Sequence, residues 1–189
     1  MLLKILIFLG LLKKNIPAIT DWGMENIIKN NMSSNHIFKI DLKWAAKSKI
    51  ELANHRRIVK NHSIKIAGKP DLNVSAAKAF KGDPDLYNPE DLLLSSLASC
   101  HMMSYLYCCE KEKIEVLSYS DDAEAILEVN TDESGRIVKV ILNPKVIISD
   151  ANQIDLALSL HTKANQLCFI ANSCNFPVEH YPVCITDHE

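Results

Sequence analysis

The sequence has few glycines, few aromatic residues and no excess of either charge. Five glycines and 6% aromatic residues in 189 positions argue against a β-sandwich, a propeller or a low-complexity chain. The 21 basic and 23 acidic residues give a formal net charge of -2, which provides no electrostatic footprint for nucleic acid or for an anionic membrane. Because 48% of the residues are hydrophobic, the chain can bury a sizeable core within one domain.

Common metal-binding and redox cysteine motifs are also missing. There is no Cys-x-x-Cys pair and no Cys/His quartet with zinc-finger spacing. The spacing does not resemble that of a small secreted scaffold, and a chain of this size folds without disulfides. We therefore expect free thiols in a reducing compartment, with a cytoplasmic location. The six cysteines are Cys100, Cys108, Cys109, Cys168, Cys174 and Cys184.

The N-terminus holds a short apolar run, Ile5 to Leu12, that follows the single cation Lys4. The run is too short for a transmembrane helix. A secretory signal remains an alternative, although no clear small-x-small cleavage site follows the run. We interpret residues 1–35 as an N-terminal extension, either loosely ordered or the product of an upstream start codon. Residues 36–189 are then a single domain.

The stretch 88–109 (NPEDLLLSSLASCHMMSYLYCC) predicts a long helix. Asn88 can cap its N-terminus, Pro89 suits its first position, and Glu90 complements the positive end of the helix dipole. Apolar residues then cover every face, which is typical of a buried helix. Cys100 lies at its centre, where a thiol ordinarily serves as a small hydrophobe.

The rest of the chain predicts strands on both sides of this helix and a second helix after it. The order β, β, helix, β, β, helix, β favours an α+β fold in which both helices stack on antiparallel sheet. The predicted elements are a strand at 36–45, a second strand run at 49–67 joined to it by a hairpin at 47–48, a long loop at 68–88, strands at 114–130 and 136–148, an amphipathic helix from Asp150 that ends before Pro177, and a short strand at 181–186.

The helical spacing limits which cysteines can react with each other. Eight residues along a helix separate two side chains by about 12 Å, so Cys100 cannot form a disulfide with Cys108 or Cys109, which we expect to be packing residues. A partner must come from elsewhere in the chain, and the second helix is the best source, with Cys168 on its apolar stripe and Cys174 just beyond. Two inward-facing thiols suit peroxide reduction: one thiolate attacks the O–O bond and becomes a sulfenic acid, and the second condenses with it.

A reactive thiolate also needs a nearby cation, because an apolar setting raises the pKa of a cysteine. Arg56 and Arg57, with Lys60 and His62 nearby, are the candidates, although each arginine could equally be a solvated strand residue. Glu90 could orient an arginine through a bidentate pair, or it could simply serve the helix dipole.

NPEDLLLSSLASC resembles the active-site helix of the OsmC/Ohr-type thiol peroxidases. In that family N-P-E-x-L opens the buried helix and the peroxidatic cysteine follows the glutamate by ten positions, as Cys100 follows Glu90. NQLCFIANS around Cys168 resembles the second-cysteine segment of the family better than the surroundings of Cys174 do. Asn165 stands where the family often has histidine, and Phe169-Ile170 replaces a proline-containing stretch.

The segments FKGDPDLYNPEDLL, CHMMSYL and CFIANSCNFPV are similar to those of an OsmC-like subgroup, and the resemblance covers about residues 36–185. It implies an OsmC-like fold in which antiparallel sheets surround a buried central helix. It also implies an intertwined homodimer with two active sites at the subunit interface, and no metal, haem or flavin.

The resemblance further implies a cysteine-based peroxidase that reduces organic hydroperoxides to alcohols. Cys100 would form the sulfenic acid and Cys168 an intramolecular disulfide with it, and a dithiol such as a lipoylated protein would reduce the enzyme again. The arginine that stabilises the thiolate in the family lies on the early hairpin, where Arg56 is our assignment and Arg57 the next candidate. Glu90 would hold that arginine.

Two alternatives remain. The first is a non-catalytic OsmC-like protein that binds a small apolar ligand at the dimer interface. The uncertain arginine and the altered segment after Cys168 motivate it. In the peroxidase hypothesis, an apolar pocket beside Cys100 would favour alkyl hydroperoxides over hydrogen peroxide. That pocket would be lined by Met102, Met103, Tyr105 and Phe169, although we expect Met103 and Tyr105 to belong to the core.

The second alternative is a metal site formed by Cys100, His101 and His62. Adjacent residues on a helix point about 100° apart, so Cys100 and His101 cannot easily bind one ion. We expect His101 to be a core histidine rather than a proton shuttle.

Overall fold

The computed structural model describes residues 35–45, 49–52 and 55–187, without the side chains of residues 49–57. The chain divides into a short unit, Met1–Lys39, and a compact unit, Ile40–Glu189. The predicted extension at 1–35 lies almost entirely outside the described residues, so it stays a prediction. All elements of secondary structure discussed below belong to the compact unit.

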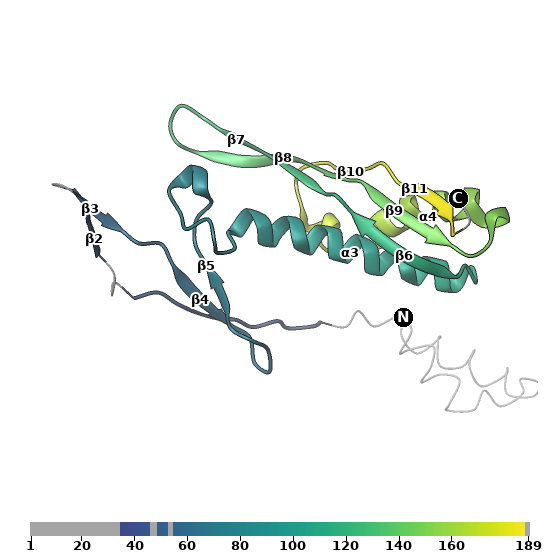
Figure 1. The fold of residues 1–189 in the computed structure, drawn as a ribbon, viewed down its shortest axis with the longest axis horizontal. Helices are drawn as coiled ribbons and strands as arrows, with labels where there is room; N and C mark the ends of the chain where they lie inside the picture. The colour runs from purple at the N-terminus through teal and green to yellow at the C-terminus, as the bar shows by residue number, and fades with distance from the viewer. Residues whose placement is uncertain (1–34, 46–48, 53–54, 188–189) are drawn as a thin grey trace, which may run out of the picture. The chain divides into compact units, whose positions relative to one another are not determined.

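Two α-helices form the centre of the described structure, α3 (Pro89–Lys111) and α4 (Ile154–Leu167) (Figure 1). The predicted start of α3 is confirmed, because the Asn88 side chain accepts a hydrogen bond from the backbone N–H of Asp91 and Pro89 occupies the first turn. The Asp91 carboxylate accepts the Asn88 backbone N–H in return, which completes a capping box. A short 3-10 turn, Ala151–Gln153, precedes α4.

The strands form several small sheets. They pair in the orders β1-β4-β5, β2-β3, β10-β8-β7 and β11-β9-β6. The strands are β1 (Asp41–Lys43), β2 (Lys49–Leu52), β3 (His55–Ile58), β4 (His62–Lys65), β5 (Leu72–Val74), β6 (Val116–Asp121), β7 (Glu124–Val129), β8 (Gly135–Leu142), β9 (Pro144–Ile148), β10 (Val178–His180) and β11 (Val183–Thr186).

The prediction of purely antiparallel sheets is wrong at two pairings, since β10 runs parallel to β8 and β11 runs parallel to β9. Both late strands follow α4, and a connection through a helix returns the chain in the same direction. The fold is α+β as predicted, but with mixed sheets.

Each of the two long strand runs predicted after α3 is divided into two strands. The first breaks between Asp121 and Glu124, and the second breaks at Asn143. The Asp121 carboxylate accepts the Asn143 backbone N–H at 2.7 Å, and the Asn143 side chain donates to the Asp122 carbonyl at 2.9 Å. These hydrogen bonds join the two interruptions to each other. Each run therefore contributes one strand to the β11-β9-β6 sheet and one to the β10-β8-β7 sheet.

The segment before α3 differs most from its prediction. Only 41–43 of the predicted strand at 36–45 is a strand, and it pairs with β4 while 49–58 forms the separate β2-β3 hairpin. The predicted turn at 47–48 lies outside the described residues. The supposed buried face of this strand, including Phe38 and Trp44, is exposed. The predicted loop at 68–88 also contains β5 and a 3-10 turn.

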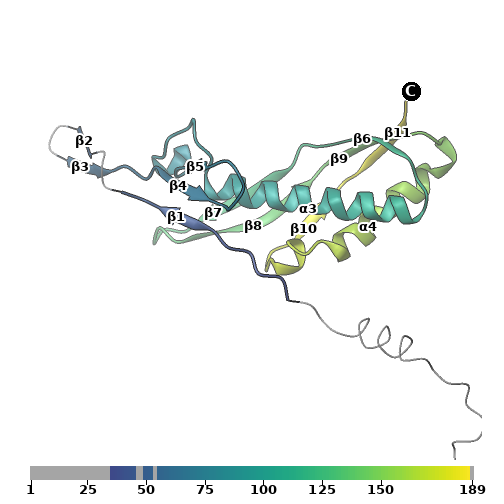
Figure 2. The same cartoon turned by 90° about the horizontal axis from the view of Figure 1, so that it is seen from below.

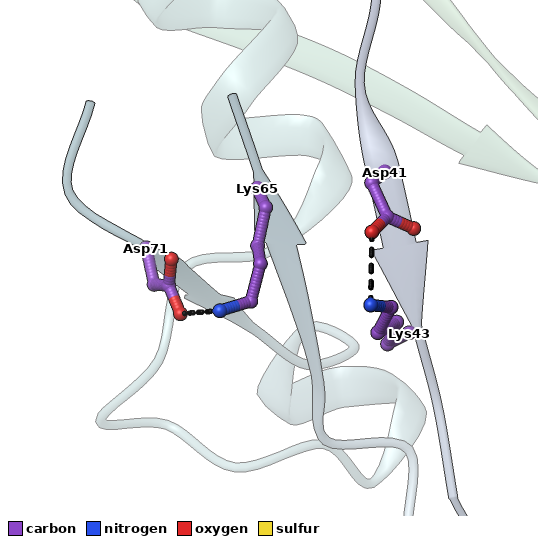
Figure 3. Close-up of polar contacts among 4 residues, drawn as sticks. All are labelled: Asp41, Lys43, Lys65 and Asp71. Carbon is purple, nitrogen blue, oxygen red and sulfur yellow. Dashed lines mark ion pairs between the residues drawn. The ribbon is translucent and has the colours of Figure 1, made fainter. Parts of the chain in front are cut away.

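Ion pairs stabilise this segment little. Lys65 Nζ lies 2.7 Å from an Asp71 carboxylate oxygen, and Lys43 Nζ lies 3.0 Å from an Asp41 carboxylate oxygen. Figure 3 shows both ion pairs. The Asp71 carboxylate raises the pKa of Lys65 through a hydrogen bond and its charge. All four side chains are solvated, and such surface pairs contribute little to stability.

α3 joins two hydrophobic clusters, one in each half of the helix. Leu97 packs with Ile137, Val140 and Leu142 of β8. Closer to the C-terminus, Tyr105 and Cys109 belong to a cluster that also contains buried residues of β9 and α4. Figure 2 shows α4 alongside this C-terminal half of α3. The helix therefore holds the two three-stranded sheets after it in one unit.

The prediction that α3 is buried on every face is wrong. Its buried stripe consists of Leu97, His101, Tyr105, Cys108 and Cys109. The opposite side is open in this chain, where Met103 is 59% exposed and Tyr107 is 52% exposed. Among the described helices, α3 is long and apolar enough to cross a membrane by length and composition, a test that core helices of soluble proteins also pass.

The buried stripes of the two helices meet at a pair of histidines. His101 of α3 and His161 of α4 are each 1% exposed, and His101 Nε2 lies 3.0 Å from His161 Nδ1 in a hydrogen bond. The Tyr105 ring stacks on His161 at 3.9 Å between centroids. His180 of β10 meets His101 edge-on at 5.4 Å.

Both histidines of this pair are held neutral. Burial, and then the neighbouring His180, lower the pKa of His101 from 6.5 to about 4. Burial, and then His101 and His180, lower the pKa of His161 to about 3. The expectation that His101 is a core histidine is confirmed.

We predict that the protein loses stability as the pH falls from 7 to 5. An unfolded histidine binds a proton below about pH 6.5, whereas His101 and His161 do not do so in the folded state until the pH approaches 4. Their contribution to stability is therefore complete above pH 6.5 and declines below it, by up to about 1.4 kcal/mol per pH unit for each histidine. Urea unfolding at pH 7, 6 and 5 measures this slope. The double variant His101→Leu/His161→Leu should show a flatter profile, and equal slopes would contradict the prediction.

Candidate functional site

Cys100 lies at the middle of α3 with a partly exposed side chain. It opens into a pocket of about 420 Å³ that is lined almost wholly by apolar groups. The other lining residues are Met103, Ser104, Tyr107, Leu167 and Phe169. Of the residues expected around an apolar pocket, Met103 and Phe169 line it. Met102 and Tyr105 do not. Tyr105 is fully buried in the core as expected, whereas the expectation that Met103 belongs to the core is wrong, because its side chain is exposed.

Cys168 follows the last residue of α4 and is 1% exposed. Burial, and then the neighbouring Cys100 thiol, raise the pKa of the Cys168 thiol. The backbone N–H of Ala171 donates to its sulfur at 3.4 Å. The structure thus places the side chains of Cys100 and Cys168 next to each other.

Cys174 lies elsewhere. Its thiol donates to the Ile170 carbonyl at 3.3 Å, and its side chain packs against the cluster that contains Leu97. Burial alone raises the pKa of the Cys174 thiol. Cys168, rather than Cys174, is therefore the cysteine of the C-terminal segment that meets Cys100.

The three remaining cysteines are core residues. Cys108, Cys109 and Cys184 are buried, and burial raises the pKa of each thiol. The expectation that Cys108 and Cys109 serve packing is confirmed. A buried thiol with a raised pKa is a poor nucleophile at neutral pH.

Glu90 lies in the first turn of α3, in a different pocket of about 260 Å³. Its Oε2 atom is buried and has no hydrogen-bond partner among the described residues. Arg136 of β8, which the sequence did not single out, lines the same pocket. Ten residues of helix separate Glu90 from Cys100 by about 15 Å, so one chain does not bring these two side chains together.

The side chain of Arg56, the cation predicted to stabilise the thiolate, lies outside the described part of the structure. The backbone of Arg56 and Arg57 lies on β3, opposite Glu51 and Ile50 of β2. Their side chains are not among the described ones, so the assignment of Arg56 as the thiolate-stabilising residue stays a prediction. None of the six residues that line the Cys100 pocket is cationic.

The metal hypothesis receives no support from the geometry. His62 lies on β4, where its Nδ1 is 2.9 Å from the Lys60 carbonyl, and His101 faces α4. Across the described ranges there is no group of three or more histidine, cysteine, aspartate or glutamate side chains that could hold a metal ion. The structure does not bring Cys100, His101 and His62 together as ligands.

Sequence reasoning missed His161 and His180. His161 lies on the buried stripe of α4, four residues after Ala157 and three before Ala164. That helical spacing was visible in the sequence, and it would have placed an imidazole opposite α3. Nothing in the sequence indicated that His180, on the short strand β10, lies beside His101.

Cys100 and Cys168 together provide the groups for dithiol chemistry. An accessible thiol faces an apolar pocket that can admit an organic group, and a second thiol behind it is shielded from water. A sulfenic acid formed on Cys100 would react with the neighbouring Cys168 thiol before it reacted with a thiol from solution.

Comparison with known proteins places this geometry in a family. The family model for OsmC-like proteins matches residues 82–181, which include both cysteines of the pair. The uncharacterized protein YmaD of Bacillus subtilis is 29% identical over 110 residues, or 57% of this chain and 73% of YmaD.

Solved structures share the fold. An OsmC-like protein of unknown function from Vibrio cholerae is 26% identical with a TM-score of 0.69, and the match covers 79% of this chain and all of that one. An organic hydroperoxide resistance protein from Elizabethkingia anophelis, 18% identical, has a TM-score of 0.61 over 82% of this chain and all of its own. Because the family model spans more than half of the sequence, the chain belongs to the OsmC-like protein family.

Proposed function

We propose that the protein is a thiol peroxidase that reduces organic hydroperoxides to alcohols. The observation that carries the proposal is the position of Cys100, at an apolar pocket, next to the buried Cys168 thiol. The organic hydroperoxide resistance proteins that share the fold, from Elizabethkingia anophelis and Legionella pneumophila, support the choice of substrate.

The reaction balances with two thiols and one external dithiol. The Cys100 thiolate attacks the terminal oxygen of the hydroperoxide, the O–O bond breaks, and the alkoxide leaves with a proton as the alcohol. The Cys168 thiol then condenses with the Cys100 sulfenic acid, forming a disulfide and releasing water. A dithiol, such as a lipoylated protein, reduces the disulfide by exchange. No step requires a metal or an organic cofactor.

The pocket favours organic hydroperoxides over hydrogen peroxide. Met103, Tyr107 and Phe169 offer apolar surface beside the Cys100 sulfur. Burial of an alkyl or aryl group there would contribute about 25 cal/mol per Å² of apolar area removed from water. Hydrogen peroxide has no such group to bury.

The working form that we propose is an intertwined homodimer with two sites. A cation held by Glu90 cannot reach Cys100 of the same chain across about 15 Å of helix. A second subunit could bring its Glu90, and with it Arg56 or Arg136, to the Cys100 pocket. The same arrangement would cover Met103, Tyr107 and Phe169, which one chain leaves exposed. We also propose a cytoplasmic location, where dithiol reductants are available.

The second candidate is a binding protein for a small apolar ligand. The pocket beside Cys100 favours it, because its lining is apolar and its volume of about 420 Å³ lies within the usual range for small-molecule sites. In this case Cys100 would be a lining residue rather than a nucleophile.

We predict that Cys100→Ser lowers the consumption of cumene hydroperoxide, with dihydrolipoamide as the donor, by about a hundredfold or more, because a hydroxyl is a far weaker nucleophile than a thiolate. Without the dithiol donor, Cys168→Ser should consume one equivalent and then stall, with a sulfenic acid that dimedone traps on Cys100. Cys174→Ser is the matched control and should retain full turnover.

The outcomes separate the two candidates. Full activity in Cys168→Ser with loss in Cys174→Ser would overturn the assignment of the second thiol. Wild-type protein that leaves the hydroperoxide unchanged, while cumyl alcohol raises its melting temperature, would support ligand binding instead.

We predict that mixed dimers recover activity that neither parent has. Glu90→Gln and Cys100→Ser subunits, each with its own tag, are co-expressed and the heterodimer is purified. If each site combines Cys100 of one subunit with Glu90 of the other, one of the two sites is wild type and turnover returns to about half. A site built within one chain would contain a defect in both subunits and stay inactive. Full activity in the Glu90→Gln homodimer would remove Glu90 from the mechanism.

A further inference from the structure

The buried histidines lie on the same two segments of the chain as the two thiols, α3 and α4 with its C-cap. In each segment the histidine is close in sequence to the cysteine. His101 follows Cys100 directly on α3. His161 precedes Cys168 by seven residues, which is two helical turns, so both are on the same face of the α4 segment. Each histidine is therefore close along its helix to one of the two cysteines.

The hydrogen bond between the histidines is a directional link between α3 and α4. His101 Nε2 and His161 Nδ1 are 3.0 Å apart and are screened from water. The Cys100 and Cys168 side chains are neighbours between the same two chain segments. The stacked Tyr105 ring fixes the plane of His161.

The remaining contacts between the helices are apolar and less specific. Ala157 and Ala164 flank His161 on the buried stripe of α4. Small residues let two helices approach closely, but dispersion contacts between them change little when one helix slides or turns slightly. A disulfide is more demanding, since its two Cα atoms must lie about 4.4–6.8 Å apart with the Cβ atoms correctly directed.

We propose that the His101–His161 hydrogen bond positions Cys100 and Cys168 for disulfide formation. It fixes the register of α3 on α4, so that the Cys168 thiol meets the Cys100 sulfur when the latter is oxidised. His101 and His161 are positioning residues and do not touch the reacting atoms. The inference rests on the proposed function only in taking Cys100 and Cys168 as the working pair.

The test measures the disulfide itself and needs no peroxide. The full-length protein is equilibrated with reduced and oxidised glutathione, and the fraction of the Cys100–Cys168 bridge is measured by mass spectrometry of peptides. In His101→Leu/His161→Leu the equilibrium constant for the bridge should fall about tenfold, which corresponds to a reduction potential about 30 mV less negative. Each single leucine variant should show nearly the full effect, because one substitution already removes the bond.

Two variants separate positioning from general loss of stability. His101→Gln keeps a polar nitrogen or oxygen at the ε position and should stay within about threefold of the wild type. Leu97→Ala creates a cavity under the other half of α3, lowers stability and should leave the bridge constant unchanged, because it acts equally on the oxidised and reduced folded forms.

Each outcome decides the proposal. It is overturned by equal constants in the wild type and the double leucine variant, by an equal shift in Leu97→Ala, or by a wild type that forms no bridge with glutathione. A further outcome separates the two proposals. If the wild type forms the bridge, the leucine variants form it less, and the wild type consumes no hydroperoxide, the positioning role is supported and the proposed peroxidase activity is ruled out.

Discussion

The packing of α3 against α4 is the constraint on which the rest of the structure depends. α3 alone reaches both hydrophobic clusters, and α4 closes the second of them. The same contact brings Cys168 to Cys100 and buries His101 against His161. Core formation and assembly of the candidate site are therefore one event: a chain that failed to dock α4 would lose its second cluster together with its second thiol.

A single chain leaves this arrangement unfinished at two places. The outer face of α3 presents Met103 and Tyr107 to solvent, and Phe169 is 81% exposed beside them. At the other end of the helix, the Glu90 carboxylate has a buried oxygen without a hydrogen-bond partner among the described residues. Uncovered apolar surface and an uncompensated carboxylate are both costly. One symmetric contact with a second copy would relieve both costs, since every surface patch is used twice in a two-fold dimer.

The sequence predicted what depends on local chemistry and on recognisable motifs. The cap at Asn88, the extent of α3 and the packing role of Cys108 followed from residue types and helical spacing. It did not predict the parallel pairing of β10 with β8, because the alternation of a strand does not say which partner it will find. It also overestimated the burial of α3, since an apolar face looks the same whether its own chain or a second one covers it.

The choice of histidine at the centre of the helix contact has a cost. Two leucines at positions 101 and 161 would pack without desolvating polar atoms, whereas His101 Nδ1 and His161 Nε2 remain buried and without hydrogen-bond partners among the described residues. A buried polar pair of this kind is not a route to greater stability. What leucines cannot provide is direction, because an N–H···N bond tolerates little sliding or rotation. If Cys100 and Cys168 form a disulfide as proposed, their geometry depends more on that direction than on additional stability.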